Sequence, residues 1–234
     1  ADYVDSDAPE VQAFVEQALA ELPSDASDRD KAIRLFEAVR DRLRYDPYRT
    51  SLDPETYRAS HIATRESGYC VPKAILLAAS LRAAGIPAAI GFADVRNHLS
   101  TEKLTELMGT DLFIYHGYVQ LWLGDETYKI TPAFNMELCE RFGVKPLVFD
   151  GYSDALFHEH DMQDRRHMEY VNDRGIFVDI PIDQFLAEFR VTYPKLCANL
   201  DNDDIAEVKD KFTAHLVPAL PGAGRISVRN IKNG

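Results

Sequence analysis

The sequence predicts an α+β fold, in which helices come first along the chain and an antiparallel sheet follows them. In the N-terminal third, apolar residues recur every three or four positions, the spacing of a helix with one buried face. From about residue 88 the spacing shortens to two, and aromatic and β-branched residues become frequent, which indicates strands. A chain of 234 residues is long enough to bury one sizeable core.

Two helices are predicted near the N-terminus, over residues 9–22 and 27–43, because each range carries an apolar stripe of helical spacing. Ser27 can cap the second helix, and Asp30 can reach back to complete a capping box. This helix should end before Pro47, because proline disfavours helical geometry at the residue that precedes it.

A longer helix is predicted over residues 70–84, with Cys70 in its first turn and Gly85 after its end. Pro72 supports this start, because a proline is tolerated only where its missing N–H group would be unpaired anyway. A short helix that begins near Asp53 leads into this turn. Unpaired amides and the positive end of the helix dipole favour a thiolate, so we expect the pKa of Cys70 to lie below its usual value. This placement is typical of a nucleophile.

Strands are predicted over residues 88–95 and 112–123, and residues 127–131 should return from a turn at Gly124 as the second arm of a hairpin. Further helices are predicted over residues 100–108, 136–142, 183–192 and 203–215, and short strands over residues 147–149 and 176–178.

We expect the chain to divide into three segments. Residues 1–135 should form the core with its N-terminal helices, and residues 136–217 an extension packed on it. Residues 218–234 hold three Gly and two Pro, which predicts a flexible tail.

Charge and composition exclude several classes of function. The net charge of −12, without a Lys/Arg cluster, argues against binding to nucleic acid or to anionic lipid. No apolar run is long enough to span a bilayer, and the N-terminus lacks the pattern of a secretory signal. The cysteines Cys70, Cys139 and Cys197 are few and widely spaced, which predicts free thiols and a cytoplasmic location, with the last two as ordinary helix residues.

His116 lies in the middle of the strand predicted over residues 112–123. A lone histidine on a strand is most simply a core residue whose ring nitrogens have partners. Cys70 at a helix start changes this interpretation, because a thiol paired with an imidazole is the recurring arrangement of cysteine nucleophiles. The two residues are therefore predicted to act as nucleophile and base.

Three segments carry a further pattern: Gly68-Tyr69-Cys70, His116-x-Tyr118-Val119-x-Leu121 and Tyr128-Lys129-Ile130-Thr131-Pro132. Together with the preceding helix they resemble the transglutaminase-like core, a papain-like cysteine fold, over about residues 27–135. The resemblance implies a Cys-His-Asp triad that forms a thioester from a peptide or small amide. It places Cys70 as nucleophile and His116 as base. The expected Asp falls at Thr131, whose hydroxyl can orient an imidazole but cannot stabilise an imidazolium as a carboxylate would.

The residue that orients His116 depends on the register of the hairpin. If Asp125 and Glu126 form the loop, His116 lies opposite Asn135, an amide that suits the role. If the loop lies one residue earlier, Thr131 is diagonal to His116 and within reach. We favour Thr131 because it holds the family-aligned position.

Other polar clusters are weaker candidates. His158, His160, Asp161 and His167 could gather around a metal, but their spacing fits no ligand framework and a solvated loop is the commoner case. Residues 201–204 resemble half of a calcium loop and lack its Gly and distal Glu. We therefore expect no metal and no cofactor.

The sequence favours cysteine-dependent acyl transfer or hydrolysis at an amide or peptide carbonyl through a thioester. The alternative is a transglutaminase-like binding or scaffolding module without activity, because a fold does not guarantee its chemistry and Thr131 replaces the expected Asp. A metal-dependent hydrolase built on His158 and its neighbours is a third hypothesis.

Overall fold

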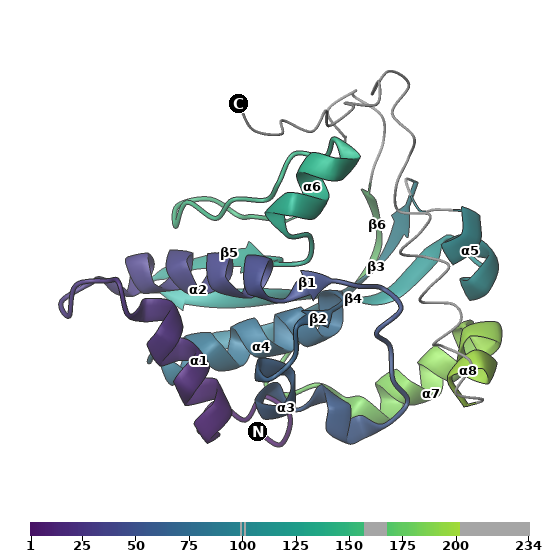
Figure 1. Cartoon of the computed structure of the whole chain (residues 1–234), viewed down its shortest axis with the longest axis horizontal. Helices are drawn as coiled ribbons and strands as arrows, with labels where there is room; N and C mark the ends of the chain where they lie inside the picture. The colour runs from purple at the N-terminus through teal and green to yellow at the C-terminus, as the bar shows by residue number, and fades with distance from the viewer. Residues whose placement is uncertain (99, 101, 157–167, 202–234) are drawn as a thin grey trace, which may run out of the picture.

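A four-stranded antiparallel sheet in the order β5-β4-β3-β6 forms one layer of the protein (Figure 1). The computed structural model describes residues 1–98, 100, 102–156 and 168–201. The strands are β3 (Ala88–Asn97), β4 (Leu112–Leu123), β5 (Glu126–Ile130) and β6 (Met168–Phe177). A separate parallel pair joins β1 (Arg44–Tyr45) to β2 (Ser67–Gly68).

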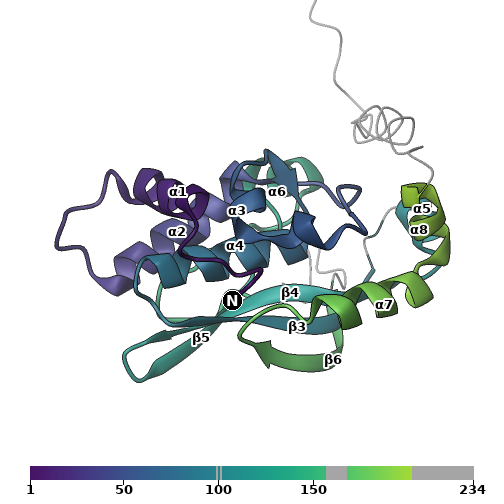
Figure 2. The same ribbon diagram turned by 90° about the horizontal axis from the view of Figure 1, so that it is seen from below.

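The N-terminal helices lie together on one side of this sheet (Figure 2). They are α1 (Pro9–Leu19), α2 (Asp28–Arg42), α3 (Ala59–Ala63) and α4 (Cys70–Ala83), with a 3-10 helix, η1 (Pro54–Tyr57), before α3. The remaining helices are α5 (Glu102–Met108), α6 (Met136–Phe142), α7 (Ile182–Thr192) and α8 (Pro194–Asp201). Helix α8 contacts both α7 and α5.

Helix α4 forms the centre of the hydrophobic core. Every residue from Val71 to Leu81 is buried, and the helix packs against β4 and β3 on one side and against α1, α2 and α3 on the other. A helix with apolar residues on every face is stable only when it is covered on all sides, and the buried Lys73 is satisfied by donating to the backbone carbonyl oxygens of Arg40 and Leu43. The first residue of this helix, Cys70, is partly exposed, so it lies where the core meets the surface.

Local sequence signals placed the N-terminal helices correctly. Ser27 caps α2, its Oγ accepting from the Asp30 N–H at 3.2 Å while the Asp30 carboxylate accepts from the Ser27 N–H at 3.2 Å, so the predicted capping box is confirmed. The long helix from Cys70 and the strand from Leu112 to Leu123 are also confirmed. The α+β class follows from this arrangement.

Two expectations in the C-terminal half were wrong, and one helix there was not predicted. Residues 147–149 form no strand. Instead, Leu147 and Phe149 bury their side chains from a loop, and the centroid of the Phe149 ring lies 6.1 Å from that of the Phe36 ring. Strand β6 runs over ten residues rather than three, and α8 was not predicted. Most of β6 was missed because it lies at the sheet edge, where apolar Tyr170, Val171 and Ile176 are exposed beside polar residues and no regular apolar alternation marks a buried face.

Residues beyond position 135 contribute to the same sheet as the predicted core, because β6 pairs with β3 along most of its length. The boundary after residue 135 stays a prediction. The helix expected over residues 203–215 and the tail expected over residues 218–234 lie outside the described residues.

Candidate active site

Cys70 is the first residue of α4, directly after the N-cap residue Tyr69. The turn before it is anchored by Tyr69, which is buried and whose hydroxyl lies 2.9 Å from the Tyr57 hydroxyl. Gly68 allows this turn to pack closely, because a Cβ there would lie 3.2 Å from the Pro72 side chain and 3.3 Å from that of Leu43. The predicted position of the cysteine at a helix start is therefore confirmed.

Gly117 lets the histidine strand approach this helix start. A Cβ on Gly117 would lie 3.0 Å from the Cys70 carbonyl oxygen, 3.0 Å from the Ala74 Cβ and 3.1 Å from the Val71 Cα. Two of these three neighbours are backbone atoms, which cannot move aside as a flexible side chain can. The glycine next to His116 thus fixes how closely β4 and α4 pack.

We expect Gly117→Ala to lower stability by about 1–3 kcal/mol, because an added methyl group forces β4 away from α4. The same displacement should slow alkylation of Cys70 by iodoacetamide. Gly109→Ala is the comparison, because it meets no atom within 4 Å but has a φ of 73° that disfavours alanine. It should lower the melting temperature and leave Cys70 reactivity unchanged; equal reactivity of the two variants would contradict the expected role of Gly117.

Cys70 and His116 line the same cavity, which has a volume of about 60 Å³. His116 is 4 % exposed, so its ring is buried in the wall. None of the described residues that line the cavity is an acid, a lysine or an arginine. The other lining residues are Tyr45, Pro47, Thr50, Tyr69, Val95, Asn97, Leu104, Met108, Phe113, Ile114, Met168, Phe189, Tyr193 and Leu196.

Thr131 lies beside His116. Its Oγ1 donates to the Gly117 carbonyl oxygen at 2.8 Å and lies 3.4 Å from the His116 Nε2. Since the hydroxyl proton is used at Gly117, the same oxygen can accept from an Nε2–H group. The 3.4 Å separation is long for such a bond. The pairing of Leu123 with Glu126 sets a register that puts Thr131 diagonal to His116.

Asn135 has a different partner. Its Oδ1 accepts from the Tyr45 N–H at 3.1 Å, which ties the start of α6 to β1. The register that would put Asn135 opposite His116 needs Asp125 and Glu126 as the loop, and this register is wrong because Glu126 is already paired. A shift of one residue was enough to exchange the two candidates.

Burial controls the protonation of both residues. It raises the pKa of the Cys70 thiol to about 11, although the backbone N–H groups of Gly117, Val71 and Cys70 itself act in the opposite direction. Burial also lowers the pKa of His116 to about 3. The closed site therefore holds a thiol and a neutral imidazole at neutral pH. The expectation that the helix start lowers the pKa of Cys70 was wrong, because desolvation exceeds the effect of the amides.

The remaining cysteines are not at the site. Cys139 and Cys197 are 2 % and 6 % exposed, and all three cysteines are free thiols. Burial also raises the pKa of Cys139, to about 11. Their low exposure predicts that Cys139 and Cys197 react slowly with alkylating reagents.

The other sequence-based site candidates lie elsewhere. His158, His160, Asp161 and His167 lie outside the described residues, as do residues 202–204 of the calcium-like loop. Among the residues that are described, no three His, Cys, Asp or Glu side chains gather as metal ligands would. Within the same ranges, no helix has the length and apolar character needed to cross a bilayer.

Sequence comparison agrees with this arrangement. The profile of the transglutaminase-like superfamily matches residues 14–130, half of the chain, and this range includes both Cys70 and His116. No curated protein matches the sequence.

Two solved structures are similar at low identity. A candidate cysteine protease from Cytophaga hutchinsonii is 15% identical, with a TM-score of 0.42 over 76% of this chain and 52% of its own. A candidate protease from Parabacteroides distasonis ATCC 8503 is 20% identical, with a TM-score of 0.35 over 51% of this chain and 22% of its own. The present chain thus spans about half or less of the length of either protein.

Proposed function

The chain belongs to the transglutaminase-like superfamily, and we propose that it is a cysteine-dependent enzyme that cleaves or transfers an acyl group at an amide. Membership of the superfamily supports a cysteine-dependent hydrolase or transferase. The observation that carries the finer proposal is the shared cavity of Cys70 and His116, with Thr131 against the imidazole. In this proposal Cys70 is the nucleophile, His116 the base and Thr131 the orienting residue.

The first half of the reaction forms a thioester. The Cys70 sulfur attacks the amide carbonyl carbon, and the thiol proton moves to the lone pair of His116 Nδ1, since Nε2 faces Thr131. Backbone N–H groups at the start of α4 can stabilise the negative charge that develops on the carbonyl oxygen. The carbon–nitrogen bond then breaks, and the amine leaves with the proton that His116 holds.

The second half releases the acyl group. Water or a second amine attacks the thioester carbon and gives a proton to His116, and the carbon–sulfur bond breaks. The sulfur takes that proton back, so the resting thiol and neutral imidazole are restored. This cycle uses a neutral pair at its start, in keeping with the raised pKa of Cys70 and the lowered pKa of His116.

The cavity supports a substrate whose acyl side is apolar. Its described lining carries no charged side chain that could pair with a substrate carboxylate or ammonium. Three of its hydroxyl groups are already engaged: that of Tyr69 bonds Tyr57, that of Tyr193 bonds the backbone of Leu112 and Ile114, and that of Thr50 donates to the Pro47 carbonyl oxygen. A charged group buried here would lose its hydration without compensation. Peptides or small amides with an aliphatic or aromatic acyl group match the chemistry of these walls, and the cavity of about 60 Å³ must widen to admit such a group.

Alkylation of Cys70 by iodoacetamide, followed by mass spectrometry, tests the proposal. At pH 7 a thiol with a raised pKa reacts only if a base takes its proton, so His116→Ala should slow labelling at least about tenfold. As the pH rises toward 11 the thiolate forms without a base, so the difference between the two proteins should shrink. Cys139 and Cys197 provide internal controls in the same digest.

The competing candidate is a binding module that kept the fold without its chemistry, and the replacement of the family's Asp by Thr131 favours it. This candidate predicts that His116→Ala leaves Cys70 labelling unchanged at every pH. That outcome would reject the proposed enzyme.

A further inference from the structure

The residue before His116 has an unusual backbone conformation. Among the described residues, Tyr115 is the one residue other than glycine with a positive φ, at 55°. This left-handed region is unfavourable for a residue with a side chain, and strained residues persist only where their surroundings hold them in place. Tyr115 is 1 % exposed and belongs to the core.

Tyr115 is part of a β-bulge in β4. Ala93 pairs with His116 and Val95 with Phe113, so Ile114 and Tyr115 together face the single residue Asp94. Without the bulge, one half of β4 would shift by a residue against β3. A shift of one residue moves every side chain of that half to the other face of the sheet. The face on which His116 lies therefore depends on this bulge.

Side chains satisfy both N–H groups of the bulge. The Tyr115 N–H donates to Asp94 Oδ1 at 3.1 Å, and the Ile114 N–H donates to the Tyr193 hydroxyl at 2.7 Å. The Tyr193 hydroxyl in turn donates to the Leu112 carbonyl oxygen at 2.9 Å. Two side chains from outside β4 thus take the place of regular ladder partners at the bulge.

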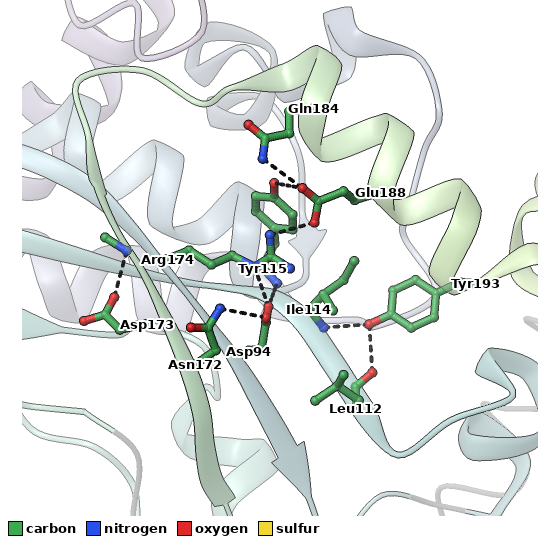
Figure 3. Close-up of polar contacts among 11 residues, drawn as sticks. Asp94, Leu112, Ile114, Tyr115, Asn172, Asp173, Arg174, Gln184, Glu188 and Tyr193 are labelled. Carbon is green, nitrogen blue, oxygen red and sulfur yellow. Dashed lines mark hydrogen bonds and ion pairs between the residues drawn. The ribbon is translucent and has the colours of Figure 1, made fainter.

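Asp94, Arg174 and Glu188 form a polar clamp that holds Tyr115 from both ends (Figure 3). Arg174 donates through Nε to Asp94 at 2.6 Å and through a terminal nitrogen to Glu188 at 2.7 Å. Glu188 accepts from the Tyr115 hydroxyl at 3.1 Å and from Gln184 at 2.8 Å. The Arg174 guanidinium also lies over the Tyr115 ring, 4.0 Å from its centroid. The chain of contacts begins at the Tyr115 N–H and returns to its hydroxyl.

We propose that this clamp positions His116 for catalysis by holding the strained bulge beside it. The inference rests on the proposed function, and it makes Asp94, Arg174 and Glu188 positioning residues. Arg174 and Glu188 come from β6 and α7, beyond the range that the family profile matches. The C-terminal part of the chain would thereby set the geometry of a base that lies in the family core. Misplacement of a catalytic group by about 1 Å can cost about a hundredfold in rate.

The test compares Arg174→Met with Arg29→Met in the full chain. Arg29 is a matched control, because it also makes an ion pair and a ring contact: it pairs with Glu126 at 3.0 Å and lies 4.2 Å from the centroid of the Tyr152 ring. None of these three residues lines the cavity. The first readout is iodoacetamide labelling of Cys70 at pH 7, with and without His116→Ala. The second is the ring-nitrogen NMR spectrum of histidine, where the His116 signal is identified by its loss in His116→Ala.

Arg174→Met should slow labelling at least about tenfold, and adding His116→Ala should slow it little further, because the base is already misplaced. The His116 ring signal should shift. Arg29→Met should keep both the wild-type signal and the full effect of His116→Ala. If Arg174→Met does not fold, Glu188→Gln, which keeps the side-chain volume and loses the charge, should give a smaller change in the same direction.

A folded Arg174→Met or Glu188→Gln that keeps the wild-type His116 signal and the full His116→Ala effect would overturn the clamp. If the single variant His116→Ala is labelled at Cys70 as fast as the wild-type protein, the proposed enzyme fails. The ring spectrum alone then decides whether the clamp positions His116. A shifted signal in that case supports the clamp as a device that positions His116, and an unchanged signal rejects it.

Discussion

Cys70→Ala is expected to reduce amide hydrolysis at least about a thousandfold, because no thioester can form without the thiol. The measurement is the release of a fluorescent aminocoumarin from N-acylated amino-acid amides. Leucyl and phenylalanyl substrates should be cleaved faster than glutamyl or lysyl ones, since the described cavity wall offers no partner for a charge. His116→Ala should reduce the rate of hydrolysis nearly as much. The double variant should be little slower than either single variant, because the two residues act as a unit.

Cys139→Ala is the matched control for this experiment, because it removes a second free thiol that does not line the cavity. It should retain wild-type hydrolysis of the leucyl substrate. Full activity in a folded Cys70→Ala protein would show that another group performs the reaction. If the wild-type protein cleaves the leucyl substrate but cleaves the glutamyl substrate faster, the assignment of Cys70 as nucleophile stands and the apolar substrate class is refuted.

Two substitutions at Thr131 are expected to have opposite effects on the reactivity of the Cys70–His116 pair. Thr131→Val removes the oxygen 3.4 Å from Nε2 and leaves the Gly117 carbonyl without its donor, so hydrolysis should fall about tenfold or more. Thr131→Asp introduces a carboxylate, which favours the imidazolium and should raise the pKa of His116 above its value of about 3. The same charge pairing should let Cys70 react with iodoacetamide at lower pH.

The measurements are an NMR titration of the His116 ring and the acid limb of the pH–rate profile for Cys70 labelling. Asn135→Ala is the comparison. It leaves the Tyr45 N–H without its acceptor, so it should lower the melting temperature but not move the pKa of His116. An unchanged His116 titration in Thr131→Asp would remove Thr131 from the orienting role, and a titration that moves in Asn135→Ala would transfer that role to Asn135.

The fold could be predicted where short-range signals are strong. The capping box of Ser27 and Asp30, the proline in the first turn of α4 and the run of β-forming residues in β4 each act over a few residues, so their elements were placed closely. Strand β6 was mostly missed, because this edge strand exposes polar and apolar side chains alike and its pairing partner lies about 80 residues earlier in the chain. Its buried neighbours, not its own pattern, keep it in the sheet.

The site could be predicted in composition but not in its electrostatics. A cysteine at a helix start and a histidine on a strand were visible as residue types at defined places. The predicted direction of the pKa shift at Cys70 was wrong, because the shift depends on how deeply β4 and the cavity walls bury the sulfur. The Asp94–Arg174–Glu188 clamp left no recognisable signal, since its members are dispersed over β3, β6 and α7 and Tyr115 has a side chain that suits an ordinary strand.

Local sequence signals were enough to predict the α+β class, the helix that begins at Cys70 and the strand that carries His116, and they left Thr131 and Asn135 as two candidates for the orienting residue. These follow from periodicity, capping and turn chemistry, which are local. Contacts between distant segments set the pairing of Glu126 with Leu123, which brings Thr131 rather than Asn135 beside His116, and hold Tyr115 in a left-handed bulge next to His116. Hairpin register and strain are set by packing between distant segments, and burial of the thiol and imidazole likewise arises only when those segments meet.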